Sequence, residues 1–299
     1  MTIRVAILPS WYPPDGGWFF RDQAAWLQDL GLAVDVLYVR PRWIRQVVRE
    51  PTSFRRLLRF SMRTEDGLRV WQLEVLLPSG FRRTDPLLMG RASLRLVRRY
   101  IQEVGRPDVL HAHSMVWAGY AAAWVSRVLN VPYVLTEHRG RFTLPLPAAR
   151  EHIPDWWRPY LGAALDNAGA VVAVGSQMSQ ALAGYSSRRV PVITVPNGVD
   201  TGFFAPAIPR RSHAQADECA GLAAGRLCTY VFVGNLTRQK GVHILLEAFD
   251  ALRKQHPEVR LVFVGSGPER TYLGEEVAHR RLADAVEFRG QLDAAGVRT

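Results

Sequence analysis

Short apolar runs and helix-period segments alternate along the first 200 residues. Two amphipathic patterns, Trp18–Leu30 and Leu87–Val104, are typical of helices, and a more uniformly apolar stretch, Met115–Leu129, predicts a third helix. The runs that predict strands are Ile3–Leu8, Ala33–Val39, Leu68–Leu77, Val109–His113, Pro132–Leu135, Ala170–Val174 and Val192–Val195. This alternation predicts an α/β fold with a doubly wound parallel sheet, in which ligands bind at the carboxyl ends of strands.

The pattern is interrupted after residue 200 and then resumes. Residues 206–225 are rich in Ala, Pro and charge, whereas Tyr230–Phe249 again reads as strand, turn and helix. Its apolar run, Tyr230–Val233, predicts a strand buried on both faces. We therefore predict a first domain over 1–200, a linker over 201–227 and a partial second domain over 228–299.

Two cations lie in the turn that follows the first strand of the second domain. Arg238 and Lys240 come after Gly234-Asn235, and Gly241 opens a helix with apolar residues at helical spacing. Free amides and the helix dipole favour anions there, although a solvated basic turn has the same composition. The turn is not a Walker loop, because no Gly-Lys-Ser/Thr follows.

A second strand-to-helix turn in this domain contains Gly265 and Gly267, followed by a proline that fits the first helical position. Small residues at such a turn allow a ligand to lie against the backbone. The turn lacks the third glycine of a dinucleotide-binding fingerprint.

Polar residues also follow three strands of the first domain. Gly16 and Gly17 allow close approach in the loop after the first strand. His113 ends the strand Val109–His113, and Glu137 and His138 follow the next one. A histidine there can exchange a hydrogen bond or proton with a substrate hydroxyl. The alternative is that these side chains are satisfied within their loops.

The net charge of +11 comes from an excess of arginine and favours anionic partners. Residues 40–63 carry one glutamate among eight arginines, with apolar and aromatic residues interleaved. Two short amphipathic helices separated by Pro51 would suit an anionic membrane surface, and an ordinary solvated helix face is the alternative. Nucleic acid is not expected as a partner, because no nucleic-acid-binding motif accompanies the charge.

The two cysteines, Cys219 and Cys228, have neither metal-ligand nor redox spacing. The chain enters a strand at once without a leader pattern, and no apolar run approaches the length of a membrane span. These features predict a reduced, cytoplasmic protein, with peripheral contact at the inner face of the membrane as a further possibility.

Six short motifs, in order and in matching strand context, resemble the retaining GT-B glycosyltransferases of family four, which have two facing Rossmann-like domains. They are Pro13–Gly17, Asp108–His113, Thr136–His138, Pro196–Asp200, Gly234–Gly241 and Gly265–Glu269. The resemblance covers nearly the whole chain and implies a second domain that is incomplete.

The resemblance assigns the acceptor to the first domain and a UDP- or GDP-linked sugar to the second. It implies that His113 lies near the reacting sugar, with Gly16, Gly17, Glu137 and His138 toward the acceptor. It implies that Arg238 and Lys240 hold the leaving diphosphate, with Gly234, Asn235, Gly265 and Gly267 around the donor. The acceptor is expected to be a polysaccharide or a lipid-linked glycan.

Fixed cations and amides can stabilise a departing diphosphate without a metal. The sequence has no Asp-x-Asp cluster, so we expect a metal-independent reaction without a cofactor. Asn235 stands where the family commonly has arginine, and the family's two glutamates eight positions apart are not found. A fragment, or an inactive truncated transferase that binds nucleotides or needs a partner, is therefore the alternative. A sugar-nucleotide epimerase is a further alternative, but no carboxylates can be assigned to proton abstraction.

Overall fold

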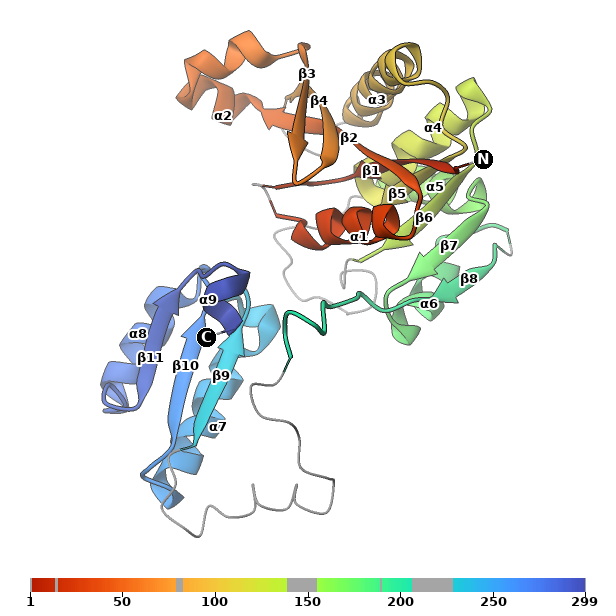
Figure 1. Cartoon of the computed structure of the whole chain (residues 1–299). Coiled ribbons are helices and arrows are strands. Elements are labelled where there is room, and N and C mark those ends of the chain that lie inside the picture. Colours follow the sequence, from red (N-terminus) through yellow and green to blue (C-terminus); the bar gives the residue numbers. More distant parts are fainter. Residues whose placement is uncertain are drawn as a thin grey trace. The chain divides into compact units, whose positions relative to one another are not determined.

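The computed structural model of the chain describes residues 2–13, 16–78, 83–138, 155–188, 190–205 and 228–298. The chain divides into two compact units, residues 1–198 and 199–299 (Figure 1). Cys219 and most of the expected linker, residues 206–227, lie outside the described residues.

The first unit is built on an eight-stranded sheet with the order β3-β4-β2-β1-β5-β6-β7-β8. Every neighbouring pair is parallel except β3 and β4, which are antiparallel. The strands are β1 (Arg4–Pro9), β2 (Ala33–Trp43), β3 (Phe60–Glu65), β4 (Leu68–Leu77), β5 (Val109–His113), β6 (Tyr133–Glu137), β7 (Ala170–Ala173) and β8 (Val192–Thr194). The predicted α/β class with a doubly wound parallel sheet is confirmed.

Helices cover both faces of this sheet. Successive residues of β1 alternate between two cores: Val5 and Ile7 pack with Ala24 of α1, whereas Ala6 and Leu8 belong to the larger core on the opposite face. Helices α3, α4 and α5 contribute to that larger core. The helices of the unit are α1 (Trp18–Asp29), α2 (Ile44–Arg49), α3 (Asp85–Glu103), α4 (Tyr120–Leu129), α5 (Arg158–Asp166) and α6 (Ser176–Ala183). None of the helices in the described segments is long and apolar enough to cross a membrane.

The single helix predicted over Met115–Leu129 is wrong in its first turn. Met115–Gly119 is a kinked segment, η2, in which Trp117 has φ 69° and ψ −77°, and α4 begins only at Tyr120. The side chain of Ser10 lies 2.5 Å from the Val116 carbonyl oxygen and accepts a hydrogen bond from the Ala118 amide at 3.2 Å. These bonds to Ser10, the residue after β1, hold the backbone away from the helical path, and apolar periodicity cannot reveal them.

The arginine-rich stretch 40–63 contains two short helices, as predicted: α2 and the 3-10 helix η1 (Pro51–Arg56), which begins at Pro51. The last residues of this stretch were expected to be helical, and this prediction is wrong. Residues from Phe60 onward form β3, because they pair antiparallel with β4 from Phe60↔Leu73 to Glu65↔Leu68. Both ends of the stretch therefore belong to the sheet, since Arg40–Trp43 lie in β2 and Phe60–Arg63 lie in β3, with the two short helices between them.

The second unit holds a three-stranded parallel sheet with the order β11-β10-β9. Its elements are β9 (Thr229–Val233), η6 (Arg238–Lys240), α7 (Val242–Gln255), β10 (Arg260–Val264), α8 (Arg270–His279), β11 (Val286–Gly290) and α9 (Ala294–Arg298). The core between the sheet and helices α7 and α8 contains Leu246, Phe249, Phe263 and Leu273.

The prediction that Tyr230–Val233 is buried on both faces is wrong. In the described sheet β9 pairs only with β10, and the Val231 and Val233 side chains are 59% and 52% exposed. A continuous apolar run is typical of a central parallel strand, but it does not distinguish that position from an edge.

Candidate functional site

Polar side chains meet at the carboxyl ends of the central strands of the first unit. The sheet pairs Pro9 of β1 with His113 of β5, and His113 with Thr136 of β6. Residues that are far apart in sequence thus end side by side, because parallel neighbouring strands finish at one edge of the sheet. His113 and Glu137 are both fully buried at this edge.

His113 and His138 form a pair at this edge. Nδ1 of His113 lies 3.0 Å from Nε2 of His138, and the two rings are stacked with centroids 5.2 Å apart. The rings of Phe19 and Phe20 at the start of α1 cover the pair, and the ring centroids of Phe20 and His113 are 4.6 Å apart. The other ring nitrogen of His113, Nε2, is buried and has no hydrogen-bond partner among the described residues.

The histidines of this edge are held in their neutral form. Burial lowers the pKa of His113 well below its ordinary value, and the neighbouring His111 and His138 lower it further. Burial also lowers the pKa of His111 and of His138 to about 4, His111 adding to the effect on His138. A neutral imidazole at His113 can accept or donate one hydrogen bond through Nε2.

This arrangement predicts that the first unit loses stability in mild acid. The unfolded chain protonates these histidines near their ordinary pKa of about 6.5, whereas the folded unit resists protonation until about pH 4. The unfolded state therefore binds more protons in this window, and stability falls as the pH is lowered through it. From about pH 7 to about pH 5 we expect a loss of up to roughly 2 kcal/mol for each histidine.

Urea unfolding followed by tryptophan fluorescence measures this loss, because all nine tryptophans lie in the first unit. A His138→Asn variant should show a shallower pH dependence. A His279→Asn variant in the second unit, where the side chain is exposed, should match the parent. A midpoint that does not change between the two pH values would contradict the prediction.

Glu137 points into the protein and organises the loop that follows β5. Its carboxylate accepts hydrogen bonds from the Ser114 hydroxyl at 2.7 Å and from the amides of Met115 at 2.6 Å and His138 at 2.8 Å. Ser114 has φ 76°, a left-handed conformation that costs energy for a residue other than glycine. These hydrogen bonds offset the strain at Ser114 and fix the backbone after β5 and after β6. The observed contacts of the Glu137 carboxylate are therefore with the chain itself.

Gly16 and Gly17 lead directly into α1. Gly17 has φ 80° at the N-cap, and a Cβ atom there would lie 2.8 Å from Cδ2 of Phe20 and 2.9 Å from the Trp11 carbonyl oxygen. Gly16 has φ 103° and would place a Cβ atom 3.5 Å from the Trp11 ring. The loop therefore needs glycine to bring the start of α1 onto the histidine pair.

In the second unit, Arg238 and Lys240 occupy the turn before α7, and both side chains are exposed. The structure gives neither side chain an ion pair or hydrogen bond with the described residues of the chain. Gly241 caps α7 in the left-handed conformation, and no side chain caps the first turn of the helix. Two cations and free amides are thus available at one helix N-terminus.

The glycines beside this turn are required by the packing of the backbone. A Cβ atom on Gly265, at φ 135°, would lie 1.9 Å from the Gly234 carbonyl oxygen, and one on Gly267 would lie 2.3 Å from that of Leu236. Amide hydrogen bonds from Gly234 to Val264 and from Leu236 to Ser266 join the two loops. Gly234, Gly265 and Gly267 therefore hold two strand-end loops together, and Asn235 between them is exposed.

A Gly265→Ala substitution is expected to unfold the second unit selectively, at a cost of about 3 kcal/mol or more from backbone strain and overlap. Hydrogen exchange should show lost protection in β9, β10 and α7, while the tryptophan fluorescence of the first unit stays unchanged. Gly274→Ala is the control, since this residue lies within α8, where only the flexible Arg270 side chain is near. Equal stability of the two variants would contradict this account.

Sequence reasoning missed the residues that position the histidine pair. Ser10, Ser114 and Phe20 carry no motif chemistry, but each contacts the edge where β1, β5 and β6 end. The available signal was position alone, because Ser114 directly follows one predicted strand and Ser10 lies two residues after another.

No three His, Cys, Asp or Glu side chains within the described segments group so as to hold a metal ion.

Solved structures share this architecture at low sequence identity. Sucrose-phosphate synthase from Thermosynechococcus elongatus matches with a TM-score of 0.67 at 18% identity, covering 99% of this chain and 72% of that chain. The Anabaena protein HepE in complex with UDP and glucose matches with a TM-score of 0.61 at 17% identity, covering 98% and 70%. The fold of the chain is accordingly of the GT-B glycosyltransferase type.

Sequence relatives extend over most of the chain. The chain is 26% identical over 282 residues to a Bacillus subtilis (strain 168) glycosyltransferase named for teichuronic acid biosynthesis. The matching region covers 91% of this chain and 66% of the relative. The chain is 28% identical over 288 residues to the D-inositol 3-phosphate glycosyltransferase of Corynebacterium urealyticum, covering 90% and 62%. The chain thus spans a little under two thirds of the length of these curated relatives.

Two family models match along the chain. Residues 224–298 match Glycosyl transferases group 1, and residues 16–203, more than half of the chain, match Glycosyltransferase Family 4. The chain therefore belongs to Glycosyltransferase Family 4.

Proposed function

We propose that this protein transfers a sugar from a UDP- or GDP-linked donor to a glycan or lipid-linked acceptor, with retention of configuration and without a metal ion. The observation that carries the proposal is the pair of exposed cations, Arg238 and Lys240, beside the uncapped N-terminus of α7. Negative charge builds on the diphosphate as the glycosidic bond to the donor breaks, and fixed cations and amides stabilise it there.

The two cations have complementary roles in this proposal. Arginine can bind two phosphate oxygens at once through its planar guanidinium group, whereas lysine acts as a point charge. Asn235 stands next to Gly234, where the family commonly has an arginine, so Arg238 supplies the bidentate contact from three residues further along.

In the first unit, His113 is the candidate group for contact with the reacting sugar. Its neutral ring is fixed by the hydrogen bond to His138, and Nε2 is left without a partner in the described structure. A hydroxyl of the donor sugar or the acceptor would satisfy this nitrogen. Phe20 covers the ring, so contact with substrate requires this aromatic side chain to move aside.

The names of similar proteins support the same class of reaction. HepE was crystallised with UDP and glucose, and one relative is named as a glycosyltransferase that acts on D-inositol 3-phosphate. A further relative is named alpha-monoglucosyldiacylglycerol synthase, from Streptococcus pneumoniae. Nucleotide-sugar donors and phosphorylated or lipid acceptors are therefore the compounds to test first.

Isothermal titration calorimetry of the chain with UDP and GDP, each with and without EDTA, tests donor binding and its metal dependence. Incubation with a panel of UDP- and GDP-sugars then tests turnover through release of the nucleoside diphosphate. The anomeric proton coupling in the NMR spectrum of the product reports retention or inversion.

We expect one nucleoside diphosphate to bind in the presence of EDTA and the matching sugar nucleotide to turn over. Binding without turnover would favour the alternative of an inactive nucleotide-binding chain. Absence of binding to both nucleotides would overturn the proposal, and binding abolished by EDTA would overturn its metal independence.

A further inference from the structure

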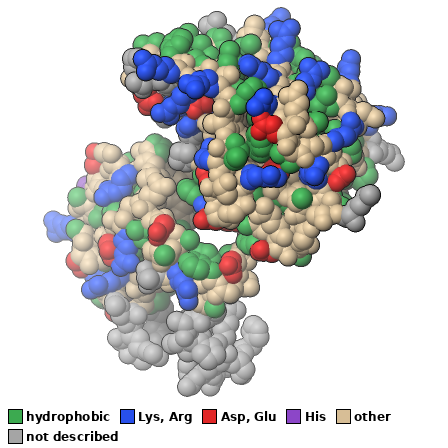
Figure 2. Space-filling view, turned by 45° about the horizontal axis from the view of Figure 1, so that its top comes forward, with side chains coloured by type: hydrophobic (Ala, Val, Ile, Leu, Met, Phe, Trp, Pro, Cys, Tyr) green, Lys and Arg blue, Asp and Glu red, His purple; other side chains and the backbone are tan. Residues whose placement is uncertain are grey.

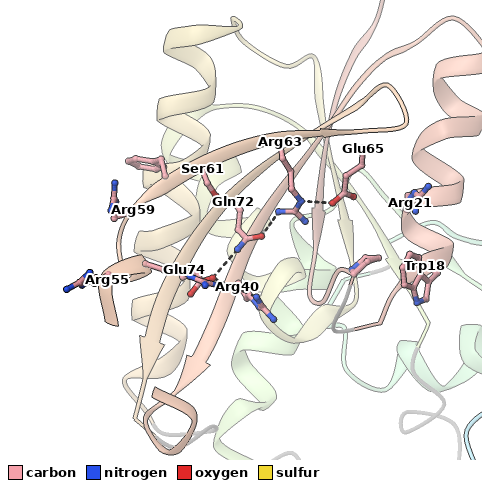
Figure 3. A pocket seen from close by; sticks show the side chains of 13 residues that line it. Trp18, Arg21, Arg40, Arg55, Arg59, Ser61, Arg63, Glu65, Gln72 and Glu74 are labelled. Carbon is pink, nitrogen blue, oxygen red and sulfur yellow. Dashed lines mark hydrogen bonds and ion pairs between the residues drawn. The ribbon is translucent and has the colours of Figure 1, made fainter. Parts of the chain in front are cut away.

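The first unit contains a pocket of about 810 Å³ beside the edge of its sheet, and many of the side chains that line this pocket are arginines (Figure 3). Its walls come from the loop before α1, from α1 itself, from η1 and from strands β2, β3 and β4. Six arginines and two glutamates line it: Arg21, Arg40, Arg55, Arg56, Arg59, Arg63, Glu65 and Glu74. Figure 2 shows arginine side chains near the top of the view, over the first unit, which contains no lysine.

The two carboxylates of the pocket are already matched by cations. Arg63 donates from Nε to Glu65 at 2.5 Å and from Nη1 to Gln72 at 2.7 Å. Glu74 is only 4% exposed, and its Oε2 lies 3.3 Å from Nε of Arg42. Neither glutamate is therefore left to repel an anion from the centre of the pocket.

Three further arginines remain without such partners. The structure gives the guanidinium groups of Arg55, Arg56 and Arg59 no ion pair or hydrogen bond to any described residue, and all three are exposed. In Figure 3, Arg55 and Arg59 lie at one end of the pocket, Trp18 and Arg21 lie at the other, and Arg63, Gln72, Glu74 and Arg40 lie between them. Like charges that line one pocket repel one another, and a bound anion would offset that repulsion.

The pocket also borders the candidate site of the same unit. Trp18, the first residue of α1, lines the pocket, and the next two residues, Phe19 and Phe20, contact His138 and His113. A molecule in the pocket would therefore lie beside the loop of Gly16 and Gly17 on the side of the unit to which we assign the acceptor.

We propose that this pocket binds a phosphate or diphosphate group of the acceptor, an inference that rests on the proposed transfer function. Three uncompensated guanidinium groups exceed what one carboxylate needs, because a single arginine holds a carboxylate bidentately. A phosphate group carries close to two negative charges and accepts several charge-assisted hydrogen bonds. The acceptor is thus either a lipid-linked phosphate or a free sugar phosphate, recognised through the same group.

Apolar side chains next to the pocket suit the lipid-linked source. Phe54, which precedes Arg55, and Leu58, which precedes Arg59, are 61% and 55% exposed. An apolar chain attached to the phosphate could lie against them, and a free sugar phosphate would not use them.

Binding of inorganic pyrophosphate, measured by isothermal titration calorimetry at constant ionic strength, tests the pocket. The measurement uses an Arg238→Gln/Lys240→Gln background, so that the proposed donor site in the second unit does not contribute. Adding Arg55→Gln/Arg56→Gln/Arg59→Gln should weaken pyrophosphate binding by about 10-fold or more, from the loss of charge-assisted hydrogen bonds.

The matched control removes three exposed arginines outside the pocket, as Arg91→Gln/Arg98→Gln/Arg127→Gln on α3 and α4. It should change pyrophosphate affinity by less than about 2-fold, since the same net charge is lost from exposed, solvent-screened side chains that do not line the pocket. Tryptophan fluorescence verifies that both triple variants keep the first unit folded. Equal weakening in both variants, no pyrophosphate binding in the background, or tighter binding of glucuronate than of pyrophosphate would each overturn the proposal.

Vesicles separate the two sources of the phosphate. If pyrophosphate displaces the protein from phosphatidylcholine vesicles containing phosphatidic acid, and the pocket variant does not bind them, a lipid phosphate enters the pocket. If pyrophosphate binds but the vesicles do not, the acceptor is a free sugar phosphate. A failure here leaves nucleotide binding by the second unit intact, so it is distinguishable from a failure of the proposed function.

Discussion

Replacing His113 with asparagine is expected to lower the turnover of the donor sugar nucleotide by about 10²- to 10⁴-fold, the range for loss of a group that exchanges a proton or hydrogen bond with the reacting substrate. Nε2 of His113 is buried without a described partner, and Nδ1 is fixed against His138. The donor's nucleotide is assigned to the second unit, so its affinity should change little. Release of nucleoside diphosphate gives the rate, and calorimetry gives the affinity.

The pH profile adds a second readout for this histidine. Because burial lowers its pKa well below the ordinary value, His113 is already neutral at pH 6 to 8, and turnover should not show its titration near the ordinary pKa of about 6.5. His279→Asn, on the exposed side of α8, is the control and should retain the parent rate. A His113→Asn variant within about 3-fold of the parent would show that the ring only fills space, since a lost catalytic proton transfer costs far more.

The double variant Arg238→Gln/Lys240→Gln is expected to lower kcat/KM for the donor by about 10²- to 10³-fold, as expected when preorganised charge at a leaving group is removed. Both side chains are exposed beside the uncapped first turn of α7, so the change should leave the fold of the unit unaltered. Steady-state kinetics with the donor identified by the nucleotide panel measures the effect.

The control for this variant removes one arginine and one lysine from the same unit, as Lys254→Gln/Arg260→Gln. Lys254 makes an exposed ion pair with Asp250, and such pairs contribute little stability. Arg238→Lys separates the two roles, because a lysine restores the charge but not the bidentate contact. If the control loses as much activity as the double variant, the effect is one of net charge, and the assignment of these two residues fails.

The fold class and most of the secondary structure could be predicted from the pattern of apolar and polar residues. The alternation of apolar runs with helix-period segments predicted the parallel strands of the first unit and β9 of the second, and nearly all boundaries agree within two or three residues. Regular elements are predictable in this way because strand and helix impose different spacings on apolar side chains. The edge position of β9 and the kink after Ser114 were not predictable, since both depend on partners distant in sequence.

The candidate site was predictable as a set of residues but not as a geometry. Their positions at or after the ends of predicted strands indicated that His113, Glu137 and His138, and also Arg238 and Lys240, are candidate site residues. Their sequence does not show that the Glu137 carboxylate binds the chain itself or that His113 is fully buried. It also does not show that Gly265 is required by the carbonyl oxygen of Gly234.

The sequence by itself determined the α/β class, the order of the parallel strands along the first unit and the chemistry available at the strand ends, because these follow from local spacing and residue type. Tertiary structure alone decided which strand ends meet, since the sheet order places β1 between β2 and β5. It also brought η1, β3 and α1 around one pocket, although their arginines span residues 21–63. Such contacts depend on the crossover of the chain between strands, which no local pattern encodes.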